Sequence, residues 1–263
     1  MPRPIRPEPM QSFDSDGVAI AYIDVPAEGG TGDPVLLIHG FASNHAVNWV
    51  NTLWVRTLTQ AGYRTIAFDN RGHGESQKLY DPDLYGADLM AQDARRLLDH
   101  LGVAWADVMG YSMGARIAAF LALDAPERVR SLLLGGLGLH LVEGRGLPDG
   151  IAEALEAEPG APAPNPTAAA FRTFAEQTKS DLRALAACMR GSRQALSRAE
   201  VAEIRTPTLV TTGTLDTVSG SGPALVALLP NATALELQNR DHSTAVGDRG
   251  HRAGVLDFFK QRP

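Results

Sequence analysis

The sequence predicts an α/β fold: a mostly parallel, twisted sheet of about eight strands, with helices on both faces and a helical lid insertion. Short apolar or β-branched runs alternate with amphipathic helical stretches, which is typical of this layered architecture. The run Val35–Ile38 has no polar residue, as expected for a strand buried on both faces. From Gly135 to Arg205 the alternation stops in a polar, Ala-rich stretch that is too long for an ordinary connection.

The individual elements follow from this alternation. Apolar residues recur at helical spacing within 47–61 and 90–101, and Gly62 and Gly102 can end these two helices. Pro126 stops the helix that begins at Met113. We expect strands at 18–25, 35–38, 65–68, 107–110, 131–134, 207–211 and 232–237. We expect helices at 47–61, 90–101, 113–124, 223–229 and 251–260.

The chain divides into a core at residues 13–136 and 204–263, a lid insertion at 137–203 and an N-terminal arm at 1–12. The arm is proline-rich and lacks the apolar stretch of a secretory signal, so we expect an extended, partly mobile segment. Within the insertion, the proline density at 158–166 forbids a helix and predicts a connector.

Composition excludes several classes of function. The 263 residues fit one α/β domain with an insertion, or at most two small domains, and their net charge of −6 gives no basic footprint for nucleic acid. No apolar run approaches the roughly 18 residues of a membrane span. Cys188 is the one cysteine, so no intrachain disulfide is possible, and its Ala/Leu-rich surroundings predict a packed apolar side chain. We expect a cytoplasmic protein.

Neither a metal nor a cofactor is expected. The sequence has no visible metal-ligand cluster or phosphate-binding loop, and G-x-G-x-x-G does not follow the first strand. The three tryptophans, Trp49, Trp54 and Trp105, are interpreted as core or pocket wall.

The strongest local signal is Gly110-Tyr111-Ser112-Met113-Gly114, which matches G-x-S-x-G between an expected strand and an expected helix. A sharp strand-to-helix turn holds the serine in a strained conformation, and the flanking glycines let the backbones pass closely. The hydroxyl is then displayed at the carboxyl edge of the sheet, beside a helix N-terminus whose free N–H groups favour an oxyanion. Ser112 is therefore the candidate nucleophile.

A serine nucleophile needs a base, and the base needs an orienting acid, in the chain order Ser, Asp or Glu, then His. His242 lies in a polar loop after the strand at 232–237 and is the candidate general base. His140 has no acid at a strand end between it and Ser112. His251 is expected to be exposed on the first turn of the last helix.

Asp216 ends the segment Gly213-Thr214-Leu215-Asp216, which directly follows the strand residues Thr208 to Thr212, and this location places its carboxylate on the same sheet edge as Ser112. It is the candidate acid. Asp241 adjoins His242, but adjacent side chains on an extended loop diverge, so it cannot easily bond the ring.

An oxyanion hole needs two backbone donors near the nucleophile. The N–H of Phe41, directly after the strand at 35–38, is one candidate, and the N–H of Met113 is the other.

With these pieces in order, the chain resembles the α/β-hydrolase superfamily, in its lid-bearing branch of bacterial serine esterases, lactonases and C–C hydrolases. The resemblance covers nearly all of residues 13–260. The matching landmarks in chain order are His39-Gly40-Phe41, Asp69 to Ser76, Gly110 to Gly114, Gly213 to Asp216 and Asp241-His242. The resemblance implies a structural role for the turn at Arg71 to Gly74.

Two features depart from the family. Its usual proline near Val218 is replaced by a flexible Ser219-Gly220-Ser221-Gly222 run, and the lid matches no defined substrate class. Haloalkane dehalogenases and soluble epoxide hydrolases resemble the chain but have Asp at the position of Ser112, so they are disfavoured.

The reaction favoured by the resemblance is hydrolysis of a carboxylic ester or related small acyl substrate through an acyl-enzyme, because ester hydrolysis makes the fewest demands on the active site. Enol-lactone opening, C–C bond hydrolysis and cofactor-free perhydrolysis are the other reactions that the branch implies. A non-catalytic receptor of the same fold, for a small ligand, is the alternative of a different class.

Overall fold

The computed structural model describes residues 9–144 and 149–262. Its strands are β1 (Gln11–Ser15), β2 (Val18–Val25), β3 (Pro34–Ile38), β4 (Arg64–Phe68), β5 (Ala106–Tyr111), β6 (Val129–Gly135), β7 (Thr208–Gly213) and β8 (Ala232–Leu237). They form one eight-stranded sheet in the order β1-β2-β4-β3-β5-β6-β7-β8. β2 pairs antiparallel with both β1 and β4, and every other neighbouring pair is parallel. The predicted mostly parallel sheet is confirmed.

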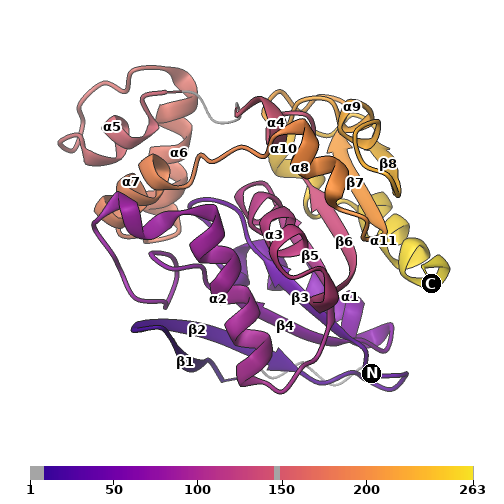
Figure 1. The fold of residues 1–263 in the computed structure, drawn as a ribbon. Helices are drawn as coiled ribbons and strands as arrows, with labels where there is room; N and C mark the ends of the chain where they lie inside the picture. The colour runs from indigo at the N-terminus through magenta and orange to yellow at the C-terminus, as the bar shows by residue number, and fades with distance from the viewer. Residues whose placement is uncertain (1–8, 145–148, 263) are drawn as a thin grey trace, which may run out of the picture.

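Helices surround this sheet (Figure 1). The α-helices are α1 (Trp54–Gln60), α2 (Ala87–His100), α3 (Met113–Asp124), α4 (His140–Glu143), α5 (Ile151–Glu156), α6 (Pro166–Gln177), α7 (Leu182–Gly191), α8 (Arg198–Glu203), α9 (Gly222–Val226), α10 (His242–Ala245) and α11 (Arg249–Gln261). A π-helical turn, η1 (Ala46–Val50), and two 3₁₀ turns, η2 (Pro82–Tyr85) and η3 (Pro126–Arg128), complete the set.

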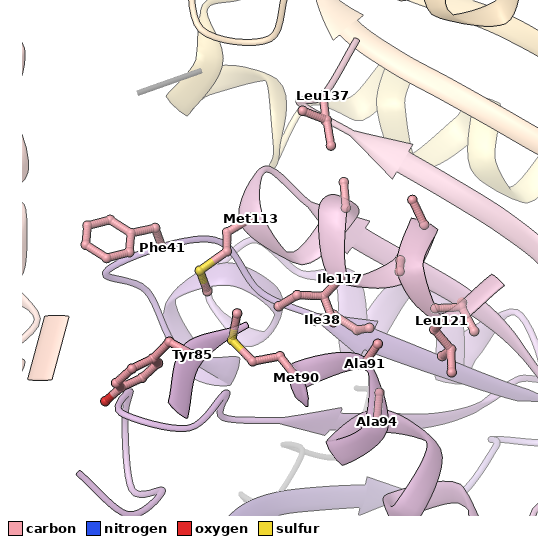
Figure 2. Packing of buried hydrophobic residues seen from close by; sticks show 14 of the residues in the cluster. Ile38, Phe41, Tyr85, Met90, Ala91, Ala94, Met113, Ile117, Leu121 and Leu137 are labelled. Atoms are coloured by element: carbon pink, nitrogen blue, oxygen red, sulfur yellow. The ribbon is translucent and has the colours of Figure 1, made fainter. Parts of the chain in front are cut away.

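The core lies on both faces of the sheet because strand side chains alternate in direction. In β3, Leu36 and Ile38 face a layer built by α2 and α3, whereas Val35 and Leu37 face a layer built by α1 and α11. Figure 2 shows part of the first layer, with Ile38 of β3, Met90 of α2 and Ile117 of α3 among its buried side chains. Burial on both faces explains why this strand has no polar residue.

Three elements differ from the sequence-based expectation. Gln11 and Ser12, which the sequence analysis assigned to the N-terminal arm, belong to β1 and pair with Tyr22 and Ala21 of β2. Residues 1–8 of that arm lie outside the described residues. The helix expected at 47–61 is two segments, because Leu53 adopts a left-handed φ of +69° between η1 and α1. Local apolar spacing does not reveal such a break. The helix expected at 223–229 is the shorter α9.

The insertion between β6 and β7 contains α4 to α8. In Figure 1, α5, α6 and α7 group together, and α7 contacts the η2 turn of the core. α8, which the sequence analysis placed in the insertion, contacts α3. The two ends of the excursion meet, because the Leu196 N–H donates to the Leu141 carbonyl at 3.1 Å. Asn165 caps α6 and Pro166 is its first residue, so the proline run ends where the helix begins.

Candidate functional site

Ser112 lies at the turn between β5 and α3. Its φ is +56° with ψ −115°, a conformation that costs a non-glycine residue on the order of 1–3 kcal/mol. The turn is held by the Ser112 N–H, which donates to the Gly135 carbonyl at 2.7 Å. A Cβ at Gly110 would collide with the Gly114 carbonyl, and one at Gly114 would collide with the Ile38 carbonyl. The two motif glycines are therefore required by close backbone contacts.

The structure brings three of the predicted site residues together. His242 Nε2 lies 3.0 Å from Ser112 Oγ, and His242 Nδ1 lies 2.9 Å from Asp216 Oδ2. These residues come from the β5–α3 turn, the start of α10 and the loop after β7, all at the carboxyl edge of the sheet. With Nδ1 donating to the carboxylate, Nε2 is left as an acceptor for the serine hydroxyl.

The Asp216 carboxylate is fixed by further donors. Burial raises its pKa, but the hydrogen bond and charge of His242, with donation from Ser219 and the Val218 N–H, hold that pKa below its ordinary value. The Ser219 hydroxyl donates to Asp216 Oδ2, and the N–H groups of Val218 and Ser219 donate to Oδ1. Asp216 is therefore a carboxylate at neutral pH, able to stabilise an imidazolium.

Asp241 does not contact the His242 ring. Its side chain caps α10 and accepts from the N–H groups of Ser243 and Thr244 at 3.0 and 2.8 Å. The backbone of His242 is held from another side, because the Tyr111 hydroxyl donates to the His242 carbonyl at 2.6 Å. Burial raises the pKa of Tyr111, so this hydroxyl stays protonated and remains a donor.

The two predicted oxyanion donors belong to residues that line one cavity together with Ser112. Met113 is the first residue of α3, so its N–H has no acceptor within the helix. Phe41 lies on the loop after β3 and lines the same cavities as Ser112. A Cβ at Gly40 would lie 3.4 Å from Ser112 Cβ, which shows how closely this loop passes the serine. Asn48 of η1 anchors the loop, accepting from the Gly40 N–H at 3.1 Å.

Two cavities open beside Ser112. The larger, about 380 Å³, is mainly apolar and lies under α6. It is lined by Gly40, Phe41, Ser43, Val47, Asn48, Thr52, Tyr111, Ser112, Ala170, Phe171, Phe174, His242, Ser243 and Val246. The smaller, about 60 Å³, is lined by Phe41, Ser112, Met113, Arg116, Gly136, Leu137, Gly144, Met189, Ser192, Arg193 and Val218. An apolar pocket with convergent polar groups is the usual form of a small-molecule site.

The remaining histidines considered in the sequence have structural environments. His140 Nδ1 donates to the Val218 carbonyl at 2.7 Å. The expectation that His251 is exposed is wrong: it is 1% exposed and packs against Trp54, because the first turn of α11 lies against β7. Its Nδ1 donates to the Ala245 carbonyl and its Nε2 accepts from the Thr211 hydroxyl. Burial lowers the pKa of His251 to about 4.

Other sequence-based expectations meet the structure with mixed outcomes. Cys188 is buried in α7, where burial raises its thiol pKa to about 12, so the packed apolar interpretation is confirmed. Trp49 and Trp54 are core residues, but Trp105 is exposed and lies under the Arg130 guanidinium. The run at 219–222, expected to be flexible, is tied by hydrogen bonds to residues 138 and 139.

Within 9–144 and 149–262, no group of three or more His, Cys, Asp or Glu side chains is arranged to hold a metal ion. None of the helices in these ranges combines the length and apolar character needed to cross a membrane.

Comparison with known proteins agrees with the observed architecture. The sequence model of a family described as the alpha/beta hydrolase fold matches residues 33–144. The crystal structure of a hydrolase from Pseudomonas aeruginosa superposes with a TM-score of 0.76 and 26% identity, over 97% of this chain and 99% of that chain. The chain has the α/β-hydrolase fold.

Curated relatives match the chain over shorter segments. The dihydrolipoyllysine-residue acetyltransferase component of the acetoin cleaving system of Cupriavidus necator is 40% identical over 126 residues, 47% of this chain and 31% of that protein. A rhodomycin D methylesterase of Streptomyces sp. is 43% identical over 115 residues, 41% of this chain and 38% of that protein. The matches thus span about a third of the length of these relatives.

Three residues that shape the candidate site were not predicted from the sequence. Ser219 contacts Asp216, Tyr111 holds the His242 backbone and Asn48 anchors the loop of Phe41. For two of them the sequence offered only their location. Ser219 begins the run that replaces the family's usual proline near Val218, and Tyr111 is the variable residue before the serine in G-x-S-x-G. The contact of Asn48 depends on η1, which the sequence did not predict.

Proposed function

We propose that the protein is a serine hydrolase that cleaves carboxylic esters or related acyl substrates through an acyl-enzyme. Ser112 is the nucleophile, His242 the general base and Asp216 the acid that orients the base. The observation that supports this most directly is the pair of contacts at His242, 3.0 Å to Ser112 Oγ and 2.9 Å to Asp216 Oδ2. The α/β-hydrolase fold and the hydrolase names of similar proteins support a hydrolase.

The geometry accounts for each step of this chemistry. Ser112 Oγ attacks the acyl carbon while its proton passes to His242 Nε2, and Asp216 stabilises the resulting imidazolium. The oxyanion accepts hydrogen bonds from the backbone N–H groups of Phe41 and Met113. Collapse of the tetrahedral intermediate breaks the bond to the leaving alkoxide, which takes the proton from His242. Water then attacks the acyl-enzyme with His242 again as base, releasing the acid and restoring Ser112.

The segment at 137–203 is proposed to act as the lid of this site. Ala170, Phe171 and Phe174 of α6 line the larger cavity, and Phe171 packs against Phe41 with ring centroids 5.9 Å apart. The Thr178 hydroxyl donates to the Ala42 carbonyl at 3.2 Å, which ties the end of α6 to the oxyanion loop. Such a cover excludes water and defines the shape of the substrate.

An ester with an apolar group of moderate size fits the larger cavity, and the similarity to a methylesterase agrees with ester chemistry. Enol-lactone opening, C–C bond hydrolysis and perhydrolysis use the same fold and stay as alternatives, to be separated by a substrate panel. A cytoplasmic location also stays a prediction.

Labelling and substitution of the serine test the proposal. A fluorophosphonate should modify Ser112 and no other serine, as read by peptide mass spectrometry. Ser112→Ala should lose ester hydrolysis by several orders of magnitude while its thermal unfolding stays cooperative. Ser12→Ala removes an exposed hydroxyl on the edge strand β1 and is the control that should retain full activity. Unchanged turnover in Ser112→Ala, or a label on another serine, would reject the assignment and favour a binding protein.

A further inference from the structure

The smaller cavity beside Ser112 differs in chemistry from the larger one. Arg116 and Arg193 are among its lining residues, and none of the described lining residues is acidic. Arg193 is ion-paired with Asp149 at 2.8 Å, so Arg116 is the arginine that bears on the chemistry of this cavity. Ser112 and Phe41 line both cavities, so a substrate carbonyl at the serine has access to each. One side of the reacting centre is therefore apolar and roomy, and the other is small and cationic.

Arg116 is placed by α3 itself. It lies four residues after Ser112, and its N–H donates to the Ser112 carbonyl at 3.2 Å. Residues at this spacing lie on the same face of a helix, with Cβ atoms about 5–6 Å apart. Ser112 is the N-cap residue before this helix, and it lines the smaller cavity together with Arg116, so both residues border the same space.

The Arg116 guanidinium is buried without an anionic partner. The residue is 8% exposed, and its hydrogen bonds go to the carbonyls of His140, Leu141 and Gln194. No carboxylate of the described chain lies within ion-pair distance of it. Burial lowers its pKa to about 10, so it still holds its proton at neutral pH. A buried charge is costly unless it is paired, and carbonyl dipoles compensate only part of that cost.

Arg116 differs in this respect from Arg71 and Arg128. Arg71 is also buried, and its guanidinium donates two hydrogen bonds to the Asp93 carboxylate. Arg128 donates to the carbonyls of Ala104 and Val103 and also to Asp99. Among these three arginines, Arg116 is the one without a carboxylate partner, so its guanidinium can bind an external anion.

We propose that the smaller cavity binds a carboxylate of the substrate on Arg116, so that the preferred substrates are acidic esters. This inference rests on the proposed ester hydrolysis. The substrate would place an apolar group in the larger cavity and a carboxylate, a few bonds from the scissile carbonyl, in the smaller one. A volume of about 60 Å³ accepts a carboxylate with a short chain, because one water needs about 10–15 Å³ on this scale.

A purely structural role for Arg116 is the competing explanation. Its partners His140, Leu141 and Gln194 belong to the two ends of the insertion, so the guanidinium also ties those ends together. A tether of this kind would affect every substrate equally. Recognition of a carboxylate affects only the charged ones, and this difference defines the test.

Two matched ester pairs test both orientations of the substrate. Benzyl hydrogen succinate is compared with benzyl 4-methylpentanoate, and carboxymethyl phenylacetate with isobutyl phenylacetate. In each pair an isopropyl group replaces the carboxylate at similar shape. We expect kcat/KM of the wild-type enzyme to favour the acidic ester at least about tenfold in one pair, since a hydrogen bond to a charged group contributes about 1.5–3 kcal/mol. A preference for the neutral ester in both pairs would overturn the inference.

Variants then assign the preference to a side chain. Arg116→Met should lower the ratio of acidic to neutral kcat/KM by about tenfold or more, and Arg116→Lys should retain an intermediate ratio because it keeps the charge. Arg128→Met is the matched control and should leave the ratio at the wild-type value. An unchanged ratio in Arg116→Met contradicts the inference. If that variant fails to fold, the wild-type and Arg116→Lys ratios decide.

Failure of this inference is distinguishable from failure of the proposed function. Hydrolysis of the neutral esters that disappears in Ser112→Ala, with no preference for the acidic ones, overturns carboxylate recognition alone. Hydrolysis that persists in Ser112→Ala overturns the serine mechanism, whatever the ratio.

Discussion

The Ser219 hydroxyl donates to Asp216 Oδ2 at 2.5 Å, the same carboxylate oxygen that faces His242 Nδ1. Ser219 is 0% exposed, and its Oγ also lies 3.5 Å from His242 Nδ1. The hydroxyl therefore acts on the charge and direction of the acid without reaching the substrate. Ser219 is best described as a positioning residue.

Ser219→Ala should lower kcat by about tenfold and change KM little, because it removes one donor that favours the ionised carboxylate. The loss should be larger at low pH than at neutral pH, since without this donor the pKa of Asp216 rises. The pH profile of kcat is the measurement. Equal losses at every pH would indicate a structural role instead.

Asp216→Asn should reduce kcat by about 10³–10⁴-fold near neutral pH, because an amide cannot stabilise the imidazolium that forms as Ser112 attacks. Asp241→Asn is the matched control, since Asp241 adjoins His242 but caps α10. We expect its cost to be far smaller. A larger loss in Asp241→Asn than in Asp216→Asn would reverse the assignment of the acid.

Phe174→Ala should move substrate preference towards bulkier apolar groups, because Phe174 lines the larger cavity from α6. In Phe174→Ala, the kcat/KM for a naphthyl ester divided by the kcat/KM for the matching phenyl ester should rise severalfold above the wild-type ratio. Phe258→Ala removes a partly buried phenyl group from α11 in the opposite layer and controls for lost stability. Its ratio should remain at the wild-type value, and a parallel shift in both variants would argue against a lid role for α6.

Acid should destabilise the protein between about pH 6.5 and pH 4. Burial lowers the pKa of His39 and of His251 to about 4, and burial of His73 lowers its pKa to about 3. An unfolded histidine takes up its proton near pH 6.5, so in this interval the unfolded state binds more protons. The free energy of unfolding therefore falls as the pH falls. The stability that the neutral buried histidines contribute is fully present only above about pH 6.5.

Urea unfolding across that interval, with wild type and His251→Gln, measures this effect. The variant should lose less stability than wild type between pH 7 and pH 4, by up to about 3 kcal/mol, because one titrating group is gone. An identical pH dependence in the two proteins would show that His251 does not contribute.

The parts of the fold that followed from the sequence are those set by local patterns. The buried run at Val35–Ile38 and the motif around Ser112 depend on residue types and spacing that are read within a few positions. Chain order and position after a strand then selected His242 and Asp216, and in the structure the His242 ring lies between Asp216 Oδ2 and Ser112 Oγ. Their catalytic roles stay proposals.

The parts that did not follow depend on contacts between distant segments. His251 was expected on an exposed turn, but the burial of that turn depends on how α11 meets β7. The break at Leu53 requires a left-handed residue that is not glycine. Arg116 is an ordinary helix residue by sequence, and its missing anionic partner becomes visible only when the surrounding chain is in place.

The hydrogen bond between Leu196 and Leu141 has an evolutionary consequence. A segment whose ends already touch can be lengthened, shortened or replaced at small entropic cost, since doubling a flexible loop adds only about 0.6 kcal/mol. The sheet that aligns Ser112, Asp216 and His242 lies outside that closed loop. Replacement of one such segment by another would therefore change which molecules enter the site without moving Ser112, Asp216 or His242. New substrate specificities can arise in this way without a new fold.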